Sequence, residues 1–387
     1  TRDERHVTRG RANSLRLALS GQLGPDALES KELYDTLALC VSCKGCKREC
    51  PTGVDMAAMK AEFLYQHHRR RPRPLRDQLI ARLPRYAPIA ARLAPLLNLR
   101  DRIPGLAALS ERLLGFAARR SLPQWRRDFF RATELPPPAA NATKDVVLFA
   151  DTFNTYFEPE NLRAALRVLT AAGYTVHAAT PADGSRPLCC GRTFVATGML
   201  DEARAEARRT LDALAPFVAR GVPIVGLEPS CLLGLRDEFR TLVPGAASAA
   251  LAAAALTFEE FLVREHSAGR LTLPLRRSRH ARALVHGHCH QKAFGVMPAV
   301  IAALKLVPEL QVSTIASSCC GMAGAFGYQA EHVDVSLKMA EADLLPAVRA
   351  AAPDTVIVAD GTSCRHQIHD GAARTAVHVA RVLADAL

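Results

Sequence analysis

The sequence is poor in aromatic residues and contains no long apolar run. Aromatic residues make up 5% of the 387 residues, whereas hydrophobic residues make up 49%. Alanine, the strongest helix former, is abundant, which favours closely packed helices. No apolar stretch approaches the ~20 residues that span a bilayer, and residues Thr1 to Arg11 lack the apolar core of a secretory signal. We therefore expect a soluble, cytoplasmic protein.

Acidic residues are outnumbered, with 38 Asp and Glu against 50 Lys and Arg. The excess of basic residues is concentrated between His67 and Arg131, where there are sixteen Arg and only four acidic residues. One interpretation is a docking surface for an acidic partner, an anionic membrane or nucleic acid, and the other is a set of solvated helix faces. Because no nucleic-acid motif accompanies the arginines, we expect no nucleic-acid partner. A peripheral contact with the inner face of the membrane stays a hypothesis.

The eleven cysteines are clustered rather than scattered. Four lie between Cys40 and Cys50, and two adjacent pairs occur at Cys189–Cys190 and Cys319–Cys320. A disulfide scaffold would be shorter and would rarely contain adjacent pairs, so this clustering without a signal peptide indicates metal ligands in a reducing compartment.

The first cluster has the spacing C-x2-C-x2-C-x3-C-P and consists of Cys40, Cys43, Cys46 and Cys50. This is the bacterial ferredoxin run, in which each thiolate binds one iron of a [4Fe–4S] cluster. A structural zinc site is the alternative, but zinc motifs usually separate two C-x2-C pairs by a dozen or more residues. In two-cluster ferredoxins the fourth cysteine binds the other cluster, so Cys50 either closes this cluster or belongs to another one.

Residues inside the run fit a cluster loop. We expect Gly45 to permit the tight turn between the cysteines. Lys44, Lys47 and Arg48 would offset the negative charge of the thiolates and favour the reduced state.

The chain divides into four regions: residues 1–66, 67–138, 139–265 and 266–387. We predict an α + α/β protein. Region 1–66 is an α-helical ferredoxin-like domain, and 67–138 is an Arg- and Pro-rich helical connector. The connector's prolines are expected to break it into short helices: Pro72, Pro74, Pro84, Pro88, Pro95 and Pro104.

The two C-terminal regions repeat the same order of strands and helices. Strands are predicted at 146–149, 174–178, 223–227, 283–286, 312–316 and 355–359. Helices are predicted at 159–172, 200–220, 298–306 and 331–350. This internal duplication implies two α/β lobes with parallel sheets that face each other, with the thiols between them just after the strand ends.

Each repeat carries a Cys-Cys-Gly motif. The first repeat supplies Cys189, Cys190 and Cys231, and the second supplies Cys289, Cys319, Cys320 and Cys364. The first repeat lacks one cysteine, and Asp151-Thr152-Phe153 occupies its place. Seven cysteines in register favour a second metal or iron–sulphur site, although buried thiols that only pack remain the alternative.

Three histidines flank Cys289. His286, His288 and His290 could add nitrogen ligands or move protons, and His288 and His290 are possible catalytic residues. The glycines Gly321, Gly324 and Gly327 have the spacing G-x2-G-x2-G, which is not the dinucleotide fingerprint. We therefore expect no nucleotide at this turn.

Through the ferredoxin run and the two Cys-Cys-Gly repeats, the chain resembles the iron–sulphur part of FAD-linked D-2-hydroxyacid dehydrogenases with CCG-domain repeats. That family includes the glycolate oxidase iron–sulphur subunit and the fused D-2-hydroxyglutarate or D-lactate dehydrogenases. The segments that look like the fused form are 1–4, 8–13, 60–64, 288–292 and 318–324. The CCG repeats are more distantly similar to those of heterodisulfide reductase.

The resemblance implies an electron-transfer module that relays electrons from flavin toward a quinone or another acceptor, such as an electron-transfer protein. FAD would be bound only by a partner or by a missing N-terminal part, so we expect no activity without a flavin domain. We also expect no full pair of CCG clusters. The alternative is a metal-dependent active site at the CCG motifs, heterodisulfide reductase-like or substrate-binding. A third hypothesis is an interaction module whose Arg-rich region docks a flavin partner.

Overall fold

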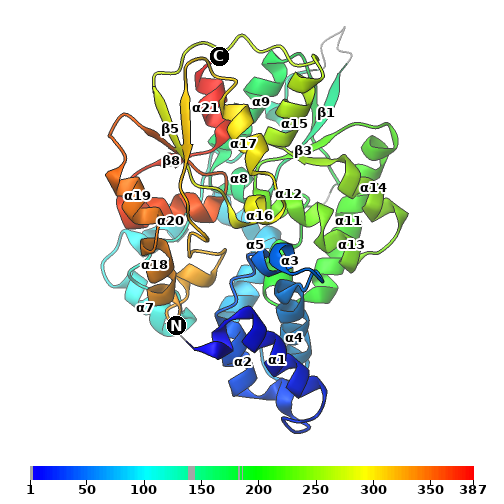
Figure 1. Ribbon diagram of the computed structural model, residues 1–387, viewed down its shortest axis with the longest axis vertical. Helices are drawn as coiled ribbons and strands as arrows, with labels where there is room; N and C mark the ends of the chain where they lie inside the picture. The colour runs from blue at the N-terminus through cyan, green and yellow to red at the C-terminus, as the bar shows by residue number, and fades with distance from the viewer. Residues whose placement is uncertain (1–2, 138–143, 182–183, 185) are drawn as a thin grey trace.

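The computed structural model describes residues 3–137, 144–181, 184 and 186–387. Helices from the N-terminal part lie at the bottom of Figure 1, and two lobes, each built on a small sheet, lie side by side above them. The α/β architecture with two parallel sheets is confirmed. The proposed boundary at residues 138 and 139 lies outside the described residues, as do Thr1 and Arg2, and the domain limits stay predictions.

The N-terminal helices pack around a small apolar core and hold the first cysteine cluster between them. They are α1 (Thr8–Leu19), α2 (Lys31–Ala38), α3 (Gly45–Glu49) and α4 (Met56–Arg70), with short 3-10 turns η1 (Glu4–His6) and η2 (Ala27–Glu29). Leu37 and Met56 are almost fully buried in this core. The side chains of Ser30 and Asp55 cap α2 and α4 by accepting hydrogen bonds from backbone N–H groups. Both helices that flank the cysteines therefore have a capped N-terminus.

Two four-stranded sheets have the same strand order. The first runs β2 (Thr175–His177), β1 (Asp145–Phe149), β3 (Ile224–Gly226), β4 (Ala255–Thr257), and the second runs β6 (Gln311–Thr314), β5 (Arg282–Val285), β7 (Val356–Val358), β8 (Ala376–Val377). Every pairing is parallel. The duplication is therefore confirmed, and the carboxyl ends of the strands in each sheet meet at one edge.

Helices connect and cover the strands of each lobe. In the first lobe they are α8 (Thr152–Tyr156), α9 (Pro159–Ala171), α10 (Arg192–Ala196), α11 (Leu200–Ala219), α12 (Pro229–Arg236), α13 (Glu238–Leu242), α14 (Ala246–Ala254) and α15 (Phe258–Ser267). In the second they are α16 (Cys289–Ala293), α17 (Met297–Leu304), η5 (Phe326–Tyr328), α18 (Val333–Glu341), α19 (Leu344–Ala350), α20 (Thr362–Ala372) and α21 (Val379–Asp385).

The prediction of one helix over 331–350 is wrong, because α18 ends at Glu341 and α19 begins at Leu344. Pro346 has no N–H to give to the carbonyl of Ala342, and its ring would clash with that carbonyl in a continuous helix. Asp343 leaves the helical conformation, with φ −147° and ψ −46°. The break therefore falls one turn before the proline.

The connector contains α5 (Leu75–Arg92), α6 (Ala94–Leu97), η3 (Asn98–Asp101), α7 (Leu106–Leu114) and η4 (Ala132–Glu134). The expected breaks at Pro84 and Pro88 are wrong, because α5 continues through both prolines. An interior proline costs a helix ~3 kcal/mol. The buried face of α5, which includes Ala81, Ala87 and Ala91, packs against α8 and α10, and we attribute the survival of the helix to this packing.

The two lobes share one core and a buried ion pair. Helix α21 packs on α9 and α17 packs on α15, so helices of each lobe cover the other. The guanidinium of Arg365 binds both carboxylate oxygens of Glu158, at 2.7 and 2.6 Å. This bidentate pair links the start of α20 to the loop before α9. None of the helices in the described ranges is long and apolar enough to cross a membrane.

Replacing Glu158 by Gln should destabilise the protein, because it removes the carboxylate charge that pairs with the buried guanidinium of Arg365 through two hydrogen bonds. We expect a loss of about 2 kcal/mol or more in the free energy of unfolding, measured by urea denaturation. The control is Glu341→Gln, which removes the exposed pair with Arg349 and should cost less than about 1 kcal/mol. Equal losses in the two variants would contradict a stabilising link between the lobes.

Candidate metal centres

The first cysteine cluster forms a loop between α2 and α4. Cys40 follows α2, Cys46 lies in α3, and Cys50 is the residue after α3. Two non-glycine residues, Ser42 and Lys44, adopt the left-handed conformation, with φ of 52° and 64°. The role assigned to Gly45 is wrong, because it begins α3 and is not among the residues with positive φ. The strain of the turn is therefore carried by its neighbours.

Lys44 is buried and fixes this loop to the first lobe. Its ammonium group lies 2.9 Å from Asp55, 2.7 Å from Asp237 and 3.0 Å from Glu238. Burial opposes the charge, but the carboxylates outweigh burial and raise the pKa of Lys44. Lys47 also pairs with Asp55 and Asp237. These carboxylates balance both lysines, which limits the compensation that we expected the lysines to give the thiolates.

Two other basic residues approach the thiols. Arg11 is 9% exposed and donates to the carbonyl of Thr36, and Lys60 donates to the carbonyls of Ala38 and Cys40 at 3.0 and 2.7 Å. Burial lowers the pKa of both groups, and nearby thiols oppose that shift. Neither residue was predicted to have a role, and their only signal in the sequence was membership of the segments that resemble the family.

Cys50 has its own set of hydrogen-bond donors. Its sulphur lies 3.1 Å from the hydroxyl of Thr52. This hydroxyl and the N–H groups of Val54, Thr52 and Gly53 lower the pKa of the Cys50 thiol. Hydrogen bonds of this kind favour a thiolate ready to bind metal.

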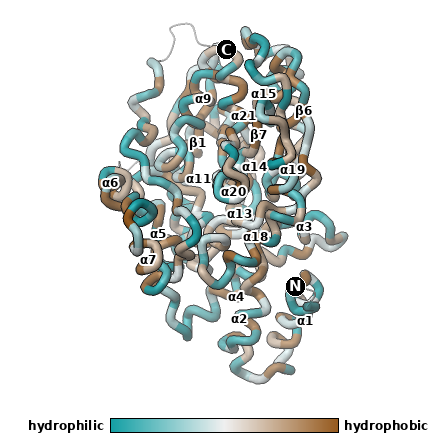
Figure 2. Tube along the Cα trace, turned by 90° about the vertical axis from the view of Figure 1, so that its left-hand side faces the viewer, coloured by the Kyte–Doolittle hydropathy of each residue, from teal (hydrophilic) through white to brown (hydrophobic). Residues whose placement is uncertain are grey.

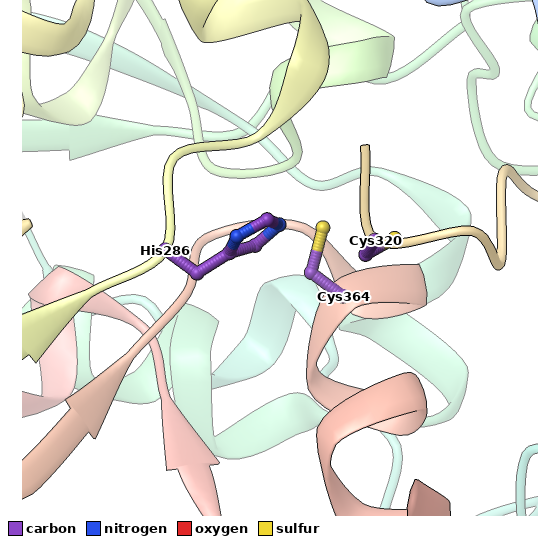
Figure 3. Close-up of side chains that lie close together, drawn as sticks. All are labelled: His286, Cys320 and Cys364. Carbon is purple, nitrogen blue, oxygen red and sulfur yellow. The ribbon is translucent and has the colours of Figure 1, made fainter. Parts of the chain in front are cut away.

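In the second repeat, His286, Cys320 and Cys364 converge. A ring nitrogen of His286 and the two sulphurs lie within 4.8 Å of one another, and all three residues are buried. Figure 3 shows the imidazole, from the loop after β5, next to Cys364 at the start of α20. Nδ1 of His286 forms a hydrogen bond of 2.9 Å with Ser317 Oγ, whereas Nε2 is buried without a hydrogen-bond partner. A buried imidazole nitrogen without a hydrogen-bond partner, beside two thiols, fits a ligand of a metal ion or cluster.

Cys289 and Cys319 complete the thiols of this repeat. Cys289 is the first residue of α16 and Cys364 the third of α20. The hydrogen bond to Cys320 and burial raise the pKa of the Cys364 thiol. A hydrogen bond from Cys319 lowers the pKa of Cys289. Hydrogen bonds from Cys319 and Cys364 likewise lower the pKa of Cys320. Four thiols and one imidazole are an N,S donor set that suits zinc or iron.

His288 and His290 make other contacts. His288 caps α16, and its Nδ1 accepts a hydrogen bond from the N–H of His290. Nε2 of His290 donates to the carbonyl of Ser42 at 3.1 Å. Burial, then Arg192, lowers the pKa of His290 to about 4, so this ring is neutral. Their catalytic role stays a prediction.

The first repeat reproduces the backbone but not the donor set. Its thiols are the buried Cys189, Cys190 and Cys231. The N–H of Gly191 lies 3.3 Å from Sγ of Cys189, as that of Gly321 lies 3.4 Å from Sγ of Cys319.

The place of the missing cysteine can be assigned from the helix starts. Asp151 caps α8 as His288 caps α16, so Thr152 stands where the second repeat has Cys289. Burial, then the charge of Glu228, raises the pKa of Asp151 to about 6. A hydroxyl replaces one thiolate, so this repeat lacks the donor set of the second.

The Cys40–Cys50 loop lies against the second repeat. Helix α3 packs on α16, as Figure 1 shows at the centre of the molecule. The hydrogen bond from His290 to Ser42 joins the neighbours of Cys289 and Cys43. Burial raises the pKa of Cys43, and the nearby Cys289 thiol adds to this shift. The structure thus brings two predicted cysteine groups together that are more than 200 residues apart in sequence.

A second buried group, Glu259, Asp360 and His378, lies between the lobes. Nδ1 of His378 accepts from the N–H of Ala380, so Nε2 carries the proton and donates to the carbonyl of Leu227 at 3.1 Å. A protonated nitrogen cannot bind metal. This group is therefore a structural junction.

Residues 283–369 match the family described as a cysteine-rich domain, CCG. The chain is 27% identical over 359 residues to D-2-hydroxyglutarate dehydrogenase of Escherichia coli (strain K12), covering 88% of this chain and 33% of that protein. It is also 27% identical over 374 residues to one of the subunits of the anaerobic glycerol-3-phosphate dehydrogenase of the same organism, covering 95% of this chain and 92% of that protein. The predicted resemblance is thereby confirmed. The chain spans about a third of the length of the D-2-hydroxyglutarate dehydrogenase.

Replacing Gly321, the glycine after Cys319 and Cys320, should affect stability and metal binding more than replacing Gly324. A Cβ at Gly321 (φ +84°) would lie 2.2 Å from the carbonyl oxygen of Ser336, whereas one at Gly324 (φ +64°) would meet nothing within 4 Å. Each Ala variant carries the left-handed penalty of about 1–2 kcal/mol. We expect Gly321→Ala to unfold at lower urea and to lose metal from the second repeat, and Gly324→Ala to keep its metal. Full metal content in Gly321→Ala would contradict the site geometry.

Proposed function

We propose that this chain is the iron–sulphur electron-transfer part of a FAD-linked D-2-hydroxyacid dehydrogenase. It would receive electrons from a flavin domain or subunit and deliver them to a quinone or an electron-transfer protein. The observation that carries the proposal is the contact of the Cys40–Cys50 loop with the helix that starts at Cys289. Two adjacent redox-capable cysteine groups are what an electron relay requires.

The first group would hold a [4Fe–4S] cluster through Cys40, Cys43 and Cys46, with Cys50 either as the fourth ligand or as a ligand of another cluster. Such a cluster accepts and releases single electrons. The chain's own residues hold the loop and set its charge. Lys44 fixes the loop, and two nearby cations, the buried Arg11 and the partly buried Lys60, favour the more negative, reduced state.

The second group would be the chain's other metal or iron–sulphur site, with the ligands Cys289, Cys319, Cys320, Cys364 and His286. Cys189, Cys190 and Cys231 are proposed as metal ligands only in a weaker, incomplete set, since Thr152 replaces the fourth thiol. No described residue is assigned to FAD, which we place on the flavin partner. The 2-hydroxy acid class rests on the resemblance and on the D-2-hydroxyglutarate dehydrogenases among the relatives.

A second candidate is a metal-dependent active site at the CCG motif itself. It is favoured by one observation, the unbonded Nε2 of His286 beside Cys320 and Cys364. A metal held there could bind a substrate or a disulfide directly. Loss of disulfide turnover in Cys319→Ser, with no effect on electron transfer from flavin, would favour this candidate.

The relay is tested by anaerobic reconstitution of the wild-type chain and of Cys43→Ser. We expect brown wild-type protein with about four irons at the first site, and loss of that iron in Cys43→Ser with the CCG metal retained. The matched control is Cys231→Ser, in the first repeat, which should keep the iron of the first site. Colourless wild-type protein with stoichiometric zinc would refute the proposal, and loss of both metals in Cys43→Ser would show that the sites are not independent.

A further inference from the structure

Exposed aliphatic side chains gather on the connector. Twelve large hydrophobic side chains are exposed in the described part of the chain, and seven of them fall within 25 residues of sequence. We call these seven the aliphatic face: Ile89, Leu93, Leu96, Leu97, Ile103, Leu109 and Leu113. Figure 2 shows hydrophobic stretches on α6 and α7 near the left-hand edge of that view. Single exposed hydrophobic residues are common, but such a concentration marks an interaction surface.

The fold holds this surface together. Arg100 donates to Ser110 Oγ at 3.2 Å and to the carbonyl of Ala117 at 2.8 Å, so α7 is tied to η3. Arg76 donates to the carbonyl of Gly115 at 3.0 Å, which ties the end of α7 to the first turn of α5. The aliphatic residues therefore stand on connected helices rather than on a free segment.

The charge beside the aliphatic face is positive. Arg92, Arg102 and Arg112 are exposed and form none of the ion pairs found among the described residues. The nearby acids are engaged: Asp101 pairs with Arg100, and Glu111 accepts a hydrogen bond from the N–H of Ala118. The surface thus presents aliphatic groups flanked by cations that no described carboxylate neutralises.

We propose that the aliphatic face docks on an anionic lipid surface. Helices that lie at a membrane interface insert aliphatic side chains and place Arg or Lys beside the lipid headgroups. The arginines alone would also suit a protein partner, but the apolar residues match one less well, because Trp and Tyr are enriched in interface hot spots whereas leucine is under-represented there. The exposed large hydrophobic residues described in this segment include no aromatic residue. The contact would be peripheral, and it does not depend on the electron-transfer proposal.

Co-sedimentation with vesicles tests this surface. The vesicles are pure phosphatidylcholine or phosphatidylcholine with about a third phosphatidylglycerol. We expect the full chain to bind only the anionic vesicles and to be released by salt. The double variant Leu96→Ser/Leu113→Ser, at residues 64% and 68% exposed, should bind at least about tenfold more weakly. The control Leu19→Ser/Leu23→Ser, at residues 75% and 50% exposed on the N-terminal part, should bind like wild type.

Several outcomes would overturn the proposal. One is wild-type protein that stays in solution with both vesicles, and another is equal binding by wild type and Leu96→Ser/Leu113→Ser. A third is seen by analytical ultracentrifugation: if the wild type is a dimer and the Leu96→Ser/Leu113→Ser variant is a monomer, the aliphatic face is a self-association surface. Loss of a co-expressed flavin subunit, with vesicle binding unchanged, would assign it to that partner.

Discussion

The buried ammonium group of Lys44 is the interaction on which the arrangement of the two cysteine groups depends. The backbone of Lys44 has a left-handed conformation within the Cys40–Cys50 loop. Its ammonium group pairs with three carboxylates, one from the N-terminal region and two from the first lobe. A buried charge is tolerated only when it is paired, so the loop and the lobe stabilise each other. With the loop held there, Ser42 reaches His290 and Cys43 comes close to Cys289.

Duplication explains both the symmetry and the asymmetry of the molecule. Two sheets of identical order place each Cys-Cys-Gly turn and one helix-borne cysteine at the same edge. The difference lies in the helix after the first strand, where Thr152 in one repeat corresponds to Cys289 in the other. Both repeats contact the Cys40–Cys50 loop, but the repeat with the full thiol set carries α16, the helix that packs on α3. The two cysteine groups that we propose as metal sites thus meet at one place.

Local patterns predicted most of the α/β part. The strands around Val147 and Ile357 and the helix from Leu200 were found from periodicity, because buried strands and amphipathic helices have clear signatures. The helix predictions were wrong where packing between residues far apart in sequence determines the local structure. Pro84 stays inside α5, and Pro346 acts one turn before its own position. The cysteine groups were predicted, but their contact and the roles of Arg11 and Lys60 depend on tertiary structure.

The most direct test of this account is a crystal structure of anaerobically reconstituted protein, with anomalous diffraction recorded on both sides of the iron edge. We predict an iron-specific peak enclosed by Cys40, Cys43 and Cys46, close to a separate metal peak at Cys289, Cys319, Cys320 and Cys364. A first site that shows zinc or no metal, or sulphurs of that loop that point apart, would contradict the account.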